Sequence, residues 1–371
     1  GSVAGASLGL ICWLVERAYC VPCGHFWLPA PPIWWLIAFY SITLCWLLFW
    51  RHRFRVLLAG VLLGWIALAI MLNVPGPRGL SGIPNQTSAD ENSHLHCTFL
   101  DVGHGTCVIL ELPDGRIWMY DAGRLGDNQR SFRYIAPSLW AIPSARIDTL
   151  IVSHADSDHY NAIPQLLERF TVGRVASTDS FWKSQASGAA ALRELLDHKG
   201  VIRLTWNSET VFSNEELLTL EVVHPQPDYY GETDNAGSLC LQLEFSGIRV
   251  LLSGDLEGSG LAALCELPPR KCQLIMAPHH GSLSLDATEF LQWCQPEVLV
   301  ISGGQRAIHQ AVIDRYSSCQ RLGITFRDGA IRVSIGTDGT YCTYRWNGQR
   351  WTQFDTCSAP DTFEVDSKFG G

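Results

Sequence analysis

The run Ser153-His154-Ala155-Asp156-Ser157-Asp158-His159 decides the fold of this chain, and it follows directly after the apolar segment 148–152. It places two imidazoles and two carboxylates within six residues, and these groups are common ligands of divalent metals. The apolar segment is predicted to be a strand, and residues two apart in extended backbone point the same way, so His154 and Asp156 can face one ion. Asp158 and His159, where a helix is predicted to begin, can turn toward a second ion.

Two segments further along the chain match this run, because each also places polar side chains directly after an apolar strand. The first is Leu251-Leu252-Ser253-Gly254-Asp255, whose carboxylate is well placed to bridge two cations. The second is Ala277-Pro278-His279-His280-Gly281-Ser282. One of its two histidines is expected to complete a metal shell, and the other is expected to donate a proton or to contact the substrate.

The rest of the segment 94–345 contains strand-like and helix-like patterns in turn. Pro113-Asp114-Gly115 and Ser246-Gly247 each predict a hairpin turn between two short apolar runs. The segment 189–198 predicts a helix that stops at Gly200. Hairpins are followed by strand–helix units, and this pattern occurs twice along the chain. We therefore predict an α/β fold with two mixed sheets and helices on the outside.

The N-terminal region 1–74 is predicted to hold two to three transmembrane helices. Segments 33–50 and 56–74 contain 18 and 19 residues without a charge. About 20 apolar residues cross the hydrocarbon core of a membrane, so both segments are candidate spans. The segment before Leu14 has the composition of the end of a third span.

The basic segment 51–55 lies between the two apolar segments and carries Arg51, Arg53 and Arg55. Loops rich in arginine remain on the cytoplasmic side, which places everything after about residue 75 outside the cytoplasm. Residues 75–93 are rich in Pro, Gly, Ser and Asn and are predicted to be a linker. Residues 346–371 are predicted to be a C-terminal tail.

The charge of the chain is unevenly distributed. The formal net charge is −9, and residues 1–73 contribute +3, so the remainder carries 23 basic and 35 acidic residues. Affinity for DNA comes largely from Lys and Arg on phosphates. Any nucleic-acid chemistry in this acidic domain must therefore depend on metal ions and on local basic residues.

In their order and spacing these motifs resemble the metallo-β-lactamase fold and, within it, the C-terminal domain of the ComEC family of DNA-internalisation competence proteins. The resemblance covers about residues 94–345, and the N-terminal apolar segments resemble the end of that family's membrane channel domain. The matching pieces are the metal run quoted above, Leu100-Asp101-Val102-Gly103-His104-Gly105, Asp121-Ala122-Gly123, Asn235 through Leu243, Leu252-Ser253-Gly254-Asp255 and Pro278-His279-His280-Gly281-Ser282.

This resemblance implies an αβ/βα sandwich with the site at the edge between the sheets. It implies a cofactor of two divalent metal ions, Zn²⁺ or Mn²⁺ with Mg²⁺ as a further option, whose ligands come from both halves of the domain. The first ion would be held by His154 and Asp156, and Asp255 would bridge. The second ion would be held by Asp158, His159 and His279.

Three departures from the usual pattern bear on the metals. Asp156 stands where the superfamily commonly has histidine, and an added carboxylate favours harder ions such as Mn²⁺ or Mg²⁺. The usual third histidine of the first site has no clear counterpart, and His224 and Asn235 are the nearest candidates. His104 stands where a glutamine is expected in the glycine-rich turn.

The residues around the ions suggest catalytic and substrate-binding roles. Asp158 is expected to orient the nucleophile, and His280 is the candidate acid for the leaving oxygen. Ser282 and Ser284 are candidates to hydrogen-bond a phosphate of the substrate, although a plain turn role is equally consistent with their positions.

The sequence therefore favours a membrane-tethered, extracytoplasmic, metal-dependent nuclease of the plasma or inner membrane. Its partners would be single-stranded DNA, the membrane and the rest of a DNA-uptake channel, and it would hydrolyse the strand that is not imported. One alternative is a metallo-hydrolase of another ester or of a lactam, such as phosphorylcholine esters. Another is a catalytically impaired structural domain of the channel, since the first site lacks a histidine.

Overall fold

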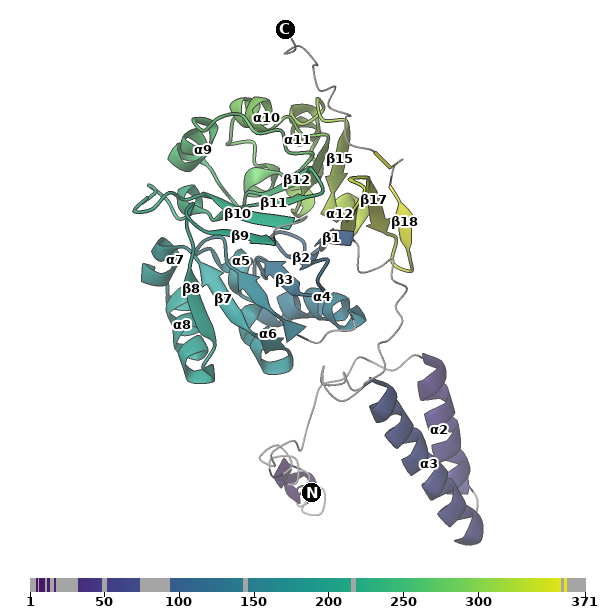
Figure 1. The fold of residues 1–371 in the computed structure, drawn as a ribbon. Coiled ribbons are helices and arrows are strands. Elements are labelled where there is room, and N and C mark those ends of the chain that lie inside the picture. Colours follow the sequence, from purple (N-terminus) through teal and green to yellow (C-terminus); the bar gives the residue numbers. More distant parts are fainter. Residues whose placement is uncertain are drawn as a thin grey trace. The chain divides into compact units, whose positions relative to one another are not determined.

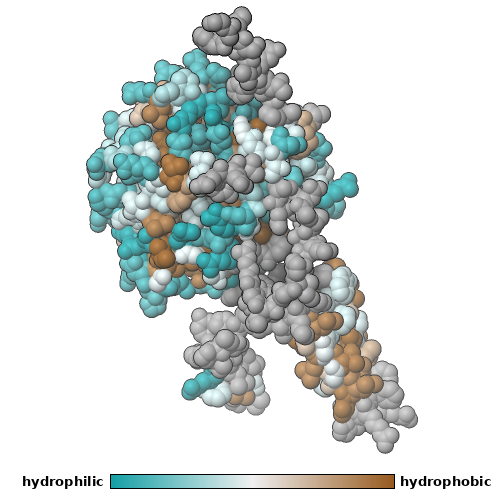
Figure 2. Space-filling view, in the orientation of Figure 1, coloured by the Kyte–Doolittle hydropathy of each residue, from teal (hydrophilic) through white to brown (hydrophobic). Residues whose placement is uncertain are grey.

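The computed structural model describes residues 5, 7–10, 12–13, 17, 33–48, 52–73, 94–142, 146–214, 218–354 and 357–358. The chain divides into two compact units, 1–83 and 84–371, and each is described by itself. In the N-terminal unit, helix α2 (Ile33–Leu48) packs against helix α3 (His52–Asn73), and the rings of Trp34 and Trp35 lie against Trp65. Figure 2 shows that hydrophobic side chains cover these two helices, whereas polar side chains dominate the visible face of the larger unit.

The prediction of transmembrane helices is not supported by these two helices. Within the described part of the chain, no helix is both long and apolar enough to cross a membrane. Helix α2 has 16 residues, fewer than the roughly 20 that a span requires, and α3 begins in the basic segment 51–55. The predicted third span before Leu14 is described only in part, and the predicted linker 75–93 lies outside the described residues.

The first half of the larger unit supplies six strands of a mixed nine-stranded sheet, and the C-terminal segment 331–353 supplies the other three (Figure 1). Its first strands form an antiparallel meander, and β3, β5, β7 and β8 then run parallel to one another. The strands, in sheet order, are β18 (Trp351–Gln353), β17 (Tyr341–Trp346), β16 (Ile331–Gly336), β1 (His94–Phe99), β2 (Val108–Glu111), β3 (Ile117–Tyr120), β5 (Thr149–Ile151), β7 (Arg174–Ser177) and β8 (Ile202–Thr205).

The second half repeats this plan in a sheet of seven strands. Three antiparallel strands are followed by parallel pairs from β12 to β15. In sheet order the strands are β15 (Arg321–Ile324), β14 (Val298–Ile301), β13 (Leu274–Met276), β12 (Ile248–Leu252), β11 (Cys240–Phe245), β10 (Leu218–His224) and β9 (Val211–Asn214). A small parallel pair joins β4 (Arg146–Ile147) to β6 (Thr171–Val172).

Helices cover the outer face of each sheet, so the prediction of an α/β sandwich with outer helices is confirmed. Helix α8 ends at Gly200, whose left-handed backbone (φ 65°) stops the helix as predicted. The helices of the first half are α4 (Asn128–Ala141), α5 (Ser157–Tyr160), α6 (Ile163–Arg169), α7 (Asp179–Lys183) and α8 (Ser187–Lys199). Those of the second half are α9 (Gly258–Cys265), α10 (Thr288–Cys294), α11 (Gln310–Arg315) and α12 (Thr325–Asp328), with short 3₁₀ turns η2 (Asn235–Gly237), η3 (Pro278–Gly281) and η4 (Gln305–Ile308).

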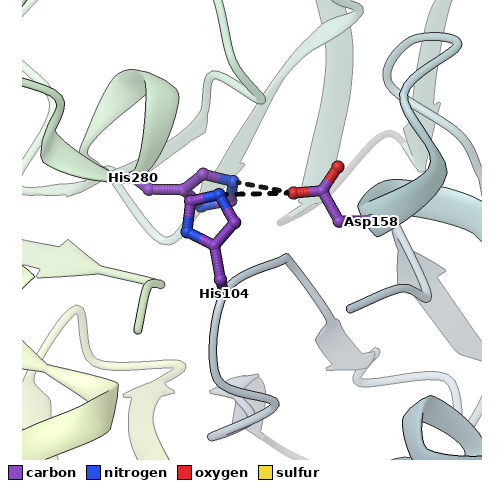
Figure 3. Close-up of side chains that lie close together, drawn as sticks. All are labelled: His104, Asp158 and His280. Carbon is purple, nitrogen blue, oxygen red and sulfur yellow. Dashed lines mark ion pairs between the residues drawn. The ribbon is translucent and has the colours of Figure 1, made fainter. Parts of the chain in front are cut away.

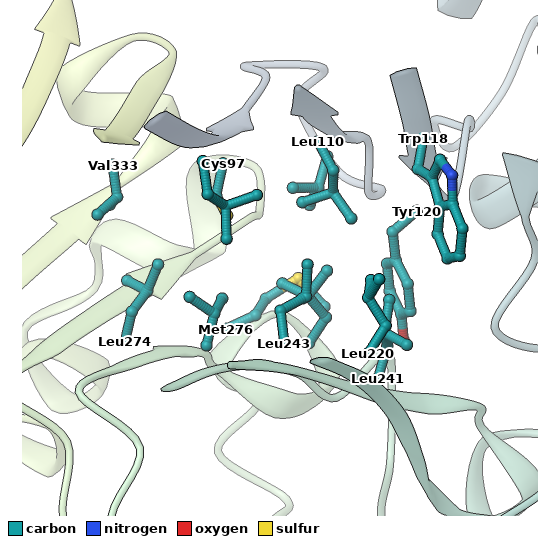
Figure 4. Close-up of a cluster of buried hydrophobic side chains, with 14 of the residues drawn as sticks. Cys97, Leu110, Trp118, Tyr120, Leu220, Leu241, Leu243, Leu274, Met276 and Val333 are labelled. Atoms are coloured by element: carbon teal, nitrogen blue, oxygen red, sulfur yellow. The ribbon is translucent and has the colours of Figure 1, made fainter. Parts of the chain in front are cut away.

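The two sheets pack face to face around a hydrophobic core. Strand β3 shows how the sequence builds it, since Trp118 and Tyr120 face the second sheet while Ile117 and Met119 face the helices. Figure 4 shows two opposed rows of side chains in this core. The row from the nine-stranded sheet includes Cys97, Leu110, Trp118, Tyr120 and Val333, and the row from the seven-stranded sheet includes Leu220, Leu241, Leu243, Leu274 and Met276.

The nine-stranded sheet continues past residue 345, where the domain was predicted to end. Strand β18 pairs with β17, and Tyr341 forms an isolated bridge with Ser358. A disulfide joins Cys342 to Cys357. The polar tail predicted for 346–371 therefore contains ordered structure up to residue 354 and at 357–358, and the rest lies outside the described residues.

Candidate metal centre

The predicted metal motifs lie in loops that follow strand ends. The run 153–159 follows β5, Asp255 follows β12, and His280 follows β13. Two further loops join them, the turn after β1 that carries His104 and the turn after β3 that carries Asp121. Since these strands end at one edge of the packed sheets, residues up to 176 positions apart in the sequence meet there.

The first donor group consists of His154, His159 and Asp255. Their ligand atoms lie within 4.8 Å of one another, and all three residues are buried. His159 Nε2 lies 3.3 Å from Asp255 Oδ1, and the two imidazole rings lie 4.2 Å apart between centroids. Two nitrogens and one carboxylate oxygen that converge in a buried space form a ligand set suited to a transition metal.

The second donor group consists of His104, Asp158 and His280. Figure 3 shows both imidazoles directed at one carboxylate oxygen of Asp158, with His104 Nε2 at 3.7 Å and His280 Nε2 at 3.5 Å. His280 and Asp158 are buried, whereas 38% of the His104 side chain is exposed. This group is therefore open to solvent on the side of His104.

Asp255 joins the two groups. Its Oδ1 faces His159, and its Oδ2 lies 3.3 Å from His280 Nε2. The His159 and His280 rings are 5.4 Å apart between centroids. Asp255 thus lies between His159 of the first group and His280 of the second.

Unpaired buried atoms in these groups fit the expected metal ions. Among the buried side-chain atoms that have no hydrogen-bond partner in the described residues, four belong to the two groups: His154 Nε2, His159 Nε2, Asp255 Oδ1 and His280 Nε2. Buried polar atoms nearly always have a partner, so a cluster of unpaired ones requires an explanation. Coordination to divalent cations satisfies all four.

The opposite nitrogens of these histidines are hydrogen-bonded, which fixes their orientation. Asp121 Oδ2 lies 2.7 Å from His159 Nδ1, and Asp121 also accepts bonds from the backbone N–H and the hydroxyl of Ser153. His280 Nδ1 lies 2.7 Å from the carbonyl oxygen of Ser302. Such outer partners are a regular feature of metal-binding histidines and aim the free nitrogen at the ion.

Sequence reasoning missed His104 and Asp121 as site residues. Both belong to motifs that carried the family resemblance, and each motif directly follows a strand, which was the available signal. Gly123 in the second motif is required by close packing, because a Cβ there would overlap the peptide between Asp158 and His159. The turn after β3 thus lies directly against the metal run.

The carboxylates of the site are held in their charged form. Burial raises the pKa of Asp158, but the interactions with His280 and His159 outweigh it and lower the pKa to about 2. The pKa of Asp255 also lies well below its usual range, since His159 and His280 outweigh the effect of burial. The same pairings raise the pKa of His159 and of His280 against burial. A metal ion must displace these protons, so its affinity is expected to fall as the pH falls.

The structure places the two neighbouring histidines in different contacts. His280, predicted as an acid, lies in the second donor group, whereas His279, predicted as a ligand, belongs to neither group and lies 2.7 Å from Glu257 through its Nδ1. The reason is the backbone of η3, in which both residues take a left-handed conformation (φ 48° and 54°). The two rings lie 6.3 Å apart between centroids, at 61° to each other.

We expect replacement of each histidine by asparagine to show which of the two binds the metal ion. Asparagine tolerates a left-handed backbone, so His279→Asn and His280→Asn form a matched pair. His280→Asn should lower metal affinity by about 100-fold, and His279→Asn by less than tenfold. Metal titration followed by mass spectrometry checks this. A larger loss in His279→Asn would restore the assignment predicted from the sequence.

Asp156, His224 and Asn235 lie outside both donor groups. The Asp156 side chain is 52% exposed, and its Oδ2 lies 3.6 Å from His154 Nε2, at the margin of the first group. His224 Nε2 is hydrogen-bonded to the carbonyl oxygen of Ala236. Asn235 donates to Glu257 instead. The two candidates for a third first-site ligand are therefore placed in other contacts.

Ser282 and Ser284 lie at the surface beside the second group. Their hydroxyls are hydrogen-bonded to each other at 2.8 Å, and both line a pocket that also contains His104 and His280. The structure therefore brings these two serines near the second donor group.

The buried His224 predicts a pH-dependent loss of stability. Burial lowers its pKa to about 4, although the bond to Ala236 acts in the opposite direction. Because the folded-state pKa lies below the ordinary value of about 6.5, the folded state binds this proton less well than the unfolded state does. The stability contribution is therefore complete above pH 6.5 and is lost as the pH falls toward 4.

His224→Gln keeps a side-chain donor but does not titrate, and it should reduce this loss by about 3 kcal/mol between pH 7 and pH 4. Urea unfolding of both proteins at several pH values, in the presence of a chelator, measures the difference. Parallel pH profiles for the two proteins would contradict the assignment.

Comparisons with known proteins identify relatives of this chain. The chain is 27% identical over 271 residues to ComE operon protein 3 of Bacillus subtilis (strain 168), which covers 66% of this chain and 34% of the relative. It is 25% identical over 249 residues to competence protein ComA of Neisseria gonorrhoeae, which covers 65% and 32%. The chain thus spans about a third of the length of these curated relatives.

A solved structure and a family description complete the comparison. CmlA, a diiron beta-hydroxylase from Streptomyces venezuelae, matches with 14% identity and a TM-score of 0.40 over 65% of this chain and 54% of that one. The description of the metallo-beta-lactamase superfamily matches residues 100–291, which is more than half of the chain and includes both donor groups. This chain therefore belongs to the metallo-β-lactamase superfamily, and the curated relatives support the predicted resemblance to the competence family.

Proposed function

We propose that this protein is a metal-dependent phosphodiesterase that acts on single-stranded DNA and hydrolyses the strand that is not imported during DNA uptake. The observation that carries the proposal is the pair of donor groups joined by Asp255. The competence relatives supply the biological context, and the rest of an uptake channel is the proposed partner.

Each group has a distinct role in this proposal. His154, His159 and Asp255 would hold one divalent ion, and His104, Asp158 and His280 would hold another. Bound together, two such ions supply an activated water near neutral pH and charge stabilisation for the oxygens of a phosphodiester. Zn²⁺ and Mn²⁺ are the proposed ions, because the set combines imidazoles with carboxylates.

The protein residues position the reactants. Asp158 is charged near neutral pH and is the proposed group that orients the attacking water. His280 Nδ1 lies against the Ser302 carbonyl oxygen, and its unpaired Nε2 faces Asp158 and Asp255, so we assign His280 to the ion rather than to proton donation. The pKa of His104 is lowered by burial and by the neighbouring His280, which keeps its ring neutral and able to bind an ion.

We also propose that the larger unit works outside the cytoplasm and is tethered to the membrane. The disulfide between Cys342 and the exposed Cys357 supports an oxidising compartment, because such bonds persist outside the cytoplasm. Protease treatment of intact and lysed cells tests this placement. Digestion of the domain only after lysis would contradict it.

Hydrolysis by the full chain tests the proposed activity. The protein, loaded with Mn²⁺ or Zn²⁺, is incubated with single-stranded DNA, with duplex DNA and with a chromogenic phosphodiester, and its metal content is measured by mass spectrometry. We expect two ions per chain and cleavage of both the diester and single-stranded DNA. Asp158→Asn serves as the inactive control.

The acidic charge of the domain favours one alternative, a hydrolase of another ester. The segment after residue 73 carries 35 acidic and 23 basic residues, which opposes tight binding of DNA. Cleavage of the chromogenic diester without any cleavage of DNA would favour this alternative. An absence of bound metal would instead favour a structural role.

A further inference from the structure

A pocket of about 390 Å³ opens beside the second donor group. It shares His104 and His280 with that group, so a molecule bound in it would lie next to the ions. The loop after β14 forms its far side and touches the turn that carries His104, since a Cβ on Gly304 would lie 3.1 Å from the His104 backbone nitrogen. The pocket is lined by His104, His279, His280, Gly281, Ser282, Leu283, Ser284, Gly304, Arg306, Ala307, His309 and Val312.

The lining of this pocket contains no carboxylate. Arg306 is the only permanently charged side chain in this lining, which also contains four histidines. A second cavity nearby, of about 560 Å³ beside α9, has the opposite character and is lined by Glu232, Glu257, Asp286 and Glu289 among others. In an acidic domain the first pocket is therefore a local exception that suits an anion.

Two arginines near the pocket have different roles. Arg315 donates to the backbone carbonyl oxygens of Ser282, Leu283 and Leu285, so it fixes the loop that forms one wall. The exposed Arg306 makes no ion pair or hydrogen bond through its side chain within the described part of the chain. Its guanidinium group remains able to form a bidentate contact with a phosphate.

Apolar and hydroxyl side chains complete the surface. Leu283 lines the pocket and is 45% exposed, and Ile308, next to the pocket, is 37% exposed. The hydroxyls of Ser282 and Ser284 lie on the same wall. A nucleotide has groups that match this surface, namely a charged phosphate, polar sugar oxygens and an apolar base face.

We propose that this pocket binds the nucleotide adjacent to the scissile phosphate in a single strand, with Arg306 and His309 on its phosphate and Leu283 against its base. The proposal rests on the proposed function, and it explains how an acidic domain selects nucleic acid. A small diester with one phosphate would not fill the pocket, whereas an oligonucleotide would.

Binding of an oligonucleotide tests this pocket separately from hydrolysis. Fluorescence anisotropy measures the dissociation constant of a labelled eight-residue oligothymidylate for the full chain, with a chelator present so that no cleavage occurs. Arg306→Gln and His309→Gln are compared with Arg350→Gln, which removes an exposed arginine in the β17–β18 turn. Circular dichroism confirms that each variant is folded.

Arg306→Gln should weaken binding by about tenfold at low salt and reduce the slope of log affinity against log salt by about 0.7, which corresponds to one lost phosphate contact on a single strand. Arg350→Gln should leave both quantities unchanged. Equal binding by the Arg306 and Arg350 variants would overturn the proposal. If the pocket variants bind weakly while wild-type protein cleaves no diester, the pocket stands and the proposed function fails. If wild-type protein cleaves the diester but Arg306→Gln binds the oligonucleotide normally, the proposed function stands and the pocket proposal fails.

Discussion

Replacing Asp255 with asparagine is expected to remove most of the activity of this protein. The carboxylate is buried and lies 3.3 Å from His159 on one side and 3.3 Å from His280 on the other, so the first donor group loses its carboxylate and the second loses an anionic neighbour. A loss of roughly 4 kcal/mol of transition-state stabilisation corresponds to a rate about 10³-fold lower. Hydrolysis of the chromogenic diester, measured together with metal content, checks both consequences.

The matched control for this variant is Glu257→Gln, which removes a carboxylate two residues away. Glu257 pairs with His279 and Asn235 and belongs to neither donor group. It should retain activity within about tenfold, in line with surface pairs that contribute little. Similar losses in the two variants would show that Asp255 has no special position between the ions.

Replacing Asp121 with alanine is expected to lower both metal affinity and stability. Asp121 is fully buried and accepts hydrogen bonds from Ser153 N–H, Ser153 Oγ–H and His159 Nδ1–H. Without it, the His159 ring loses the partner that fixes its orientation, and metal affinity should fall by about 10- to 100-fold. The buried imidazole is also left unpaired, which should cost about 3–5 kcal/mol of unfolding free energy.

Metal titration and urea unfolding in a chelator measure these two effects independently. Asp121→Asn is the informative companion, because its amide oxygen can still accept the Ser153 N–H bond while the negative charge is lost. It should recover part of the stability and less of the metal affinity. Full metal affinity in Asp121→Ala would show that the His159 ring is fixed by its other neighbours.

Local sequence patterns predicted much of the architecture. The two hairpin turns and the helix stop at Gly200 appear in the structure, because each depends on residues close in the sequence, and the two predicted mixed sheets appear as well. The transmembrane prediction followed from the same kind of pattern and is not supported. An uncharged run of 18 residues produced a described helix of only 16, since composition does not set the residue at which a helix ends.

The pair His279 and His280 shows the limit of this reasoning. The sequence gives no reason to prefer one of two adjacent histidines as the metal ligand, because the choice between them depends on the direction of each ring. The left-handed backbone of η3 sets that direction, and it places His280 with Asp158 and leaves His279 with Glu257. The amino-acid sequence of the segment does not predict this backbone conformation.

The sequence by itself determined the family, the fold class and a dense set of metal-ligand types, since strand-end motifs and their order are local features. Only the tertiary structure decided how those residues divide into two groups, that His104 lies with Asp158 and Asp121 lies against His159, and that His224 and Asn235 lie in other contacts. The physical reason is distance along the chain. His104 and His280 meet because two separate sheets pack face to face around one core, and that packing depends on side chains from both halves at once.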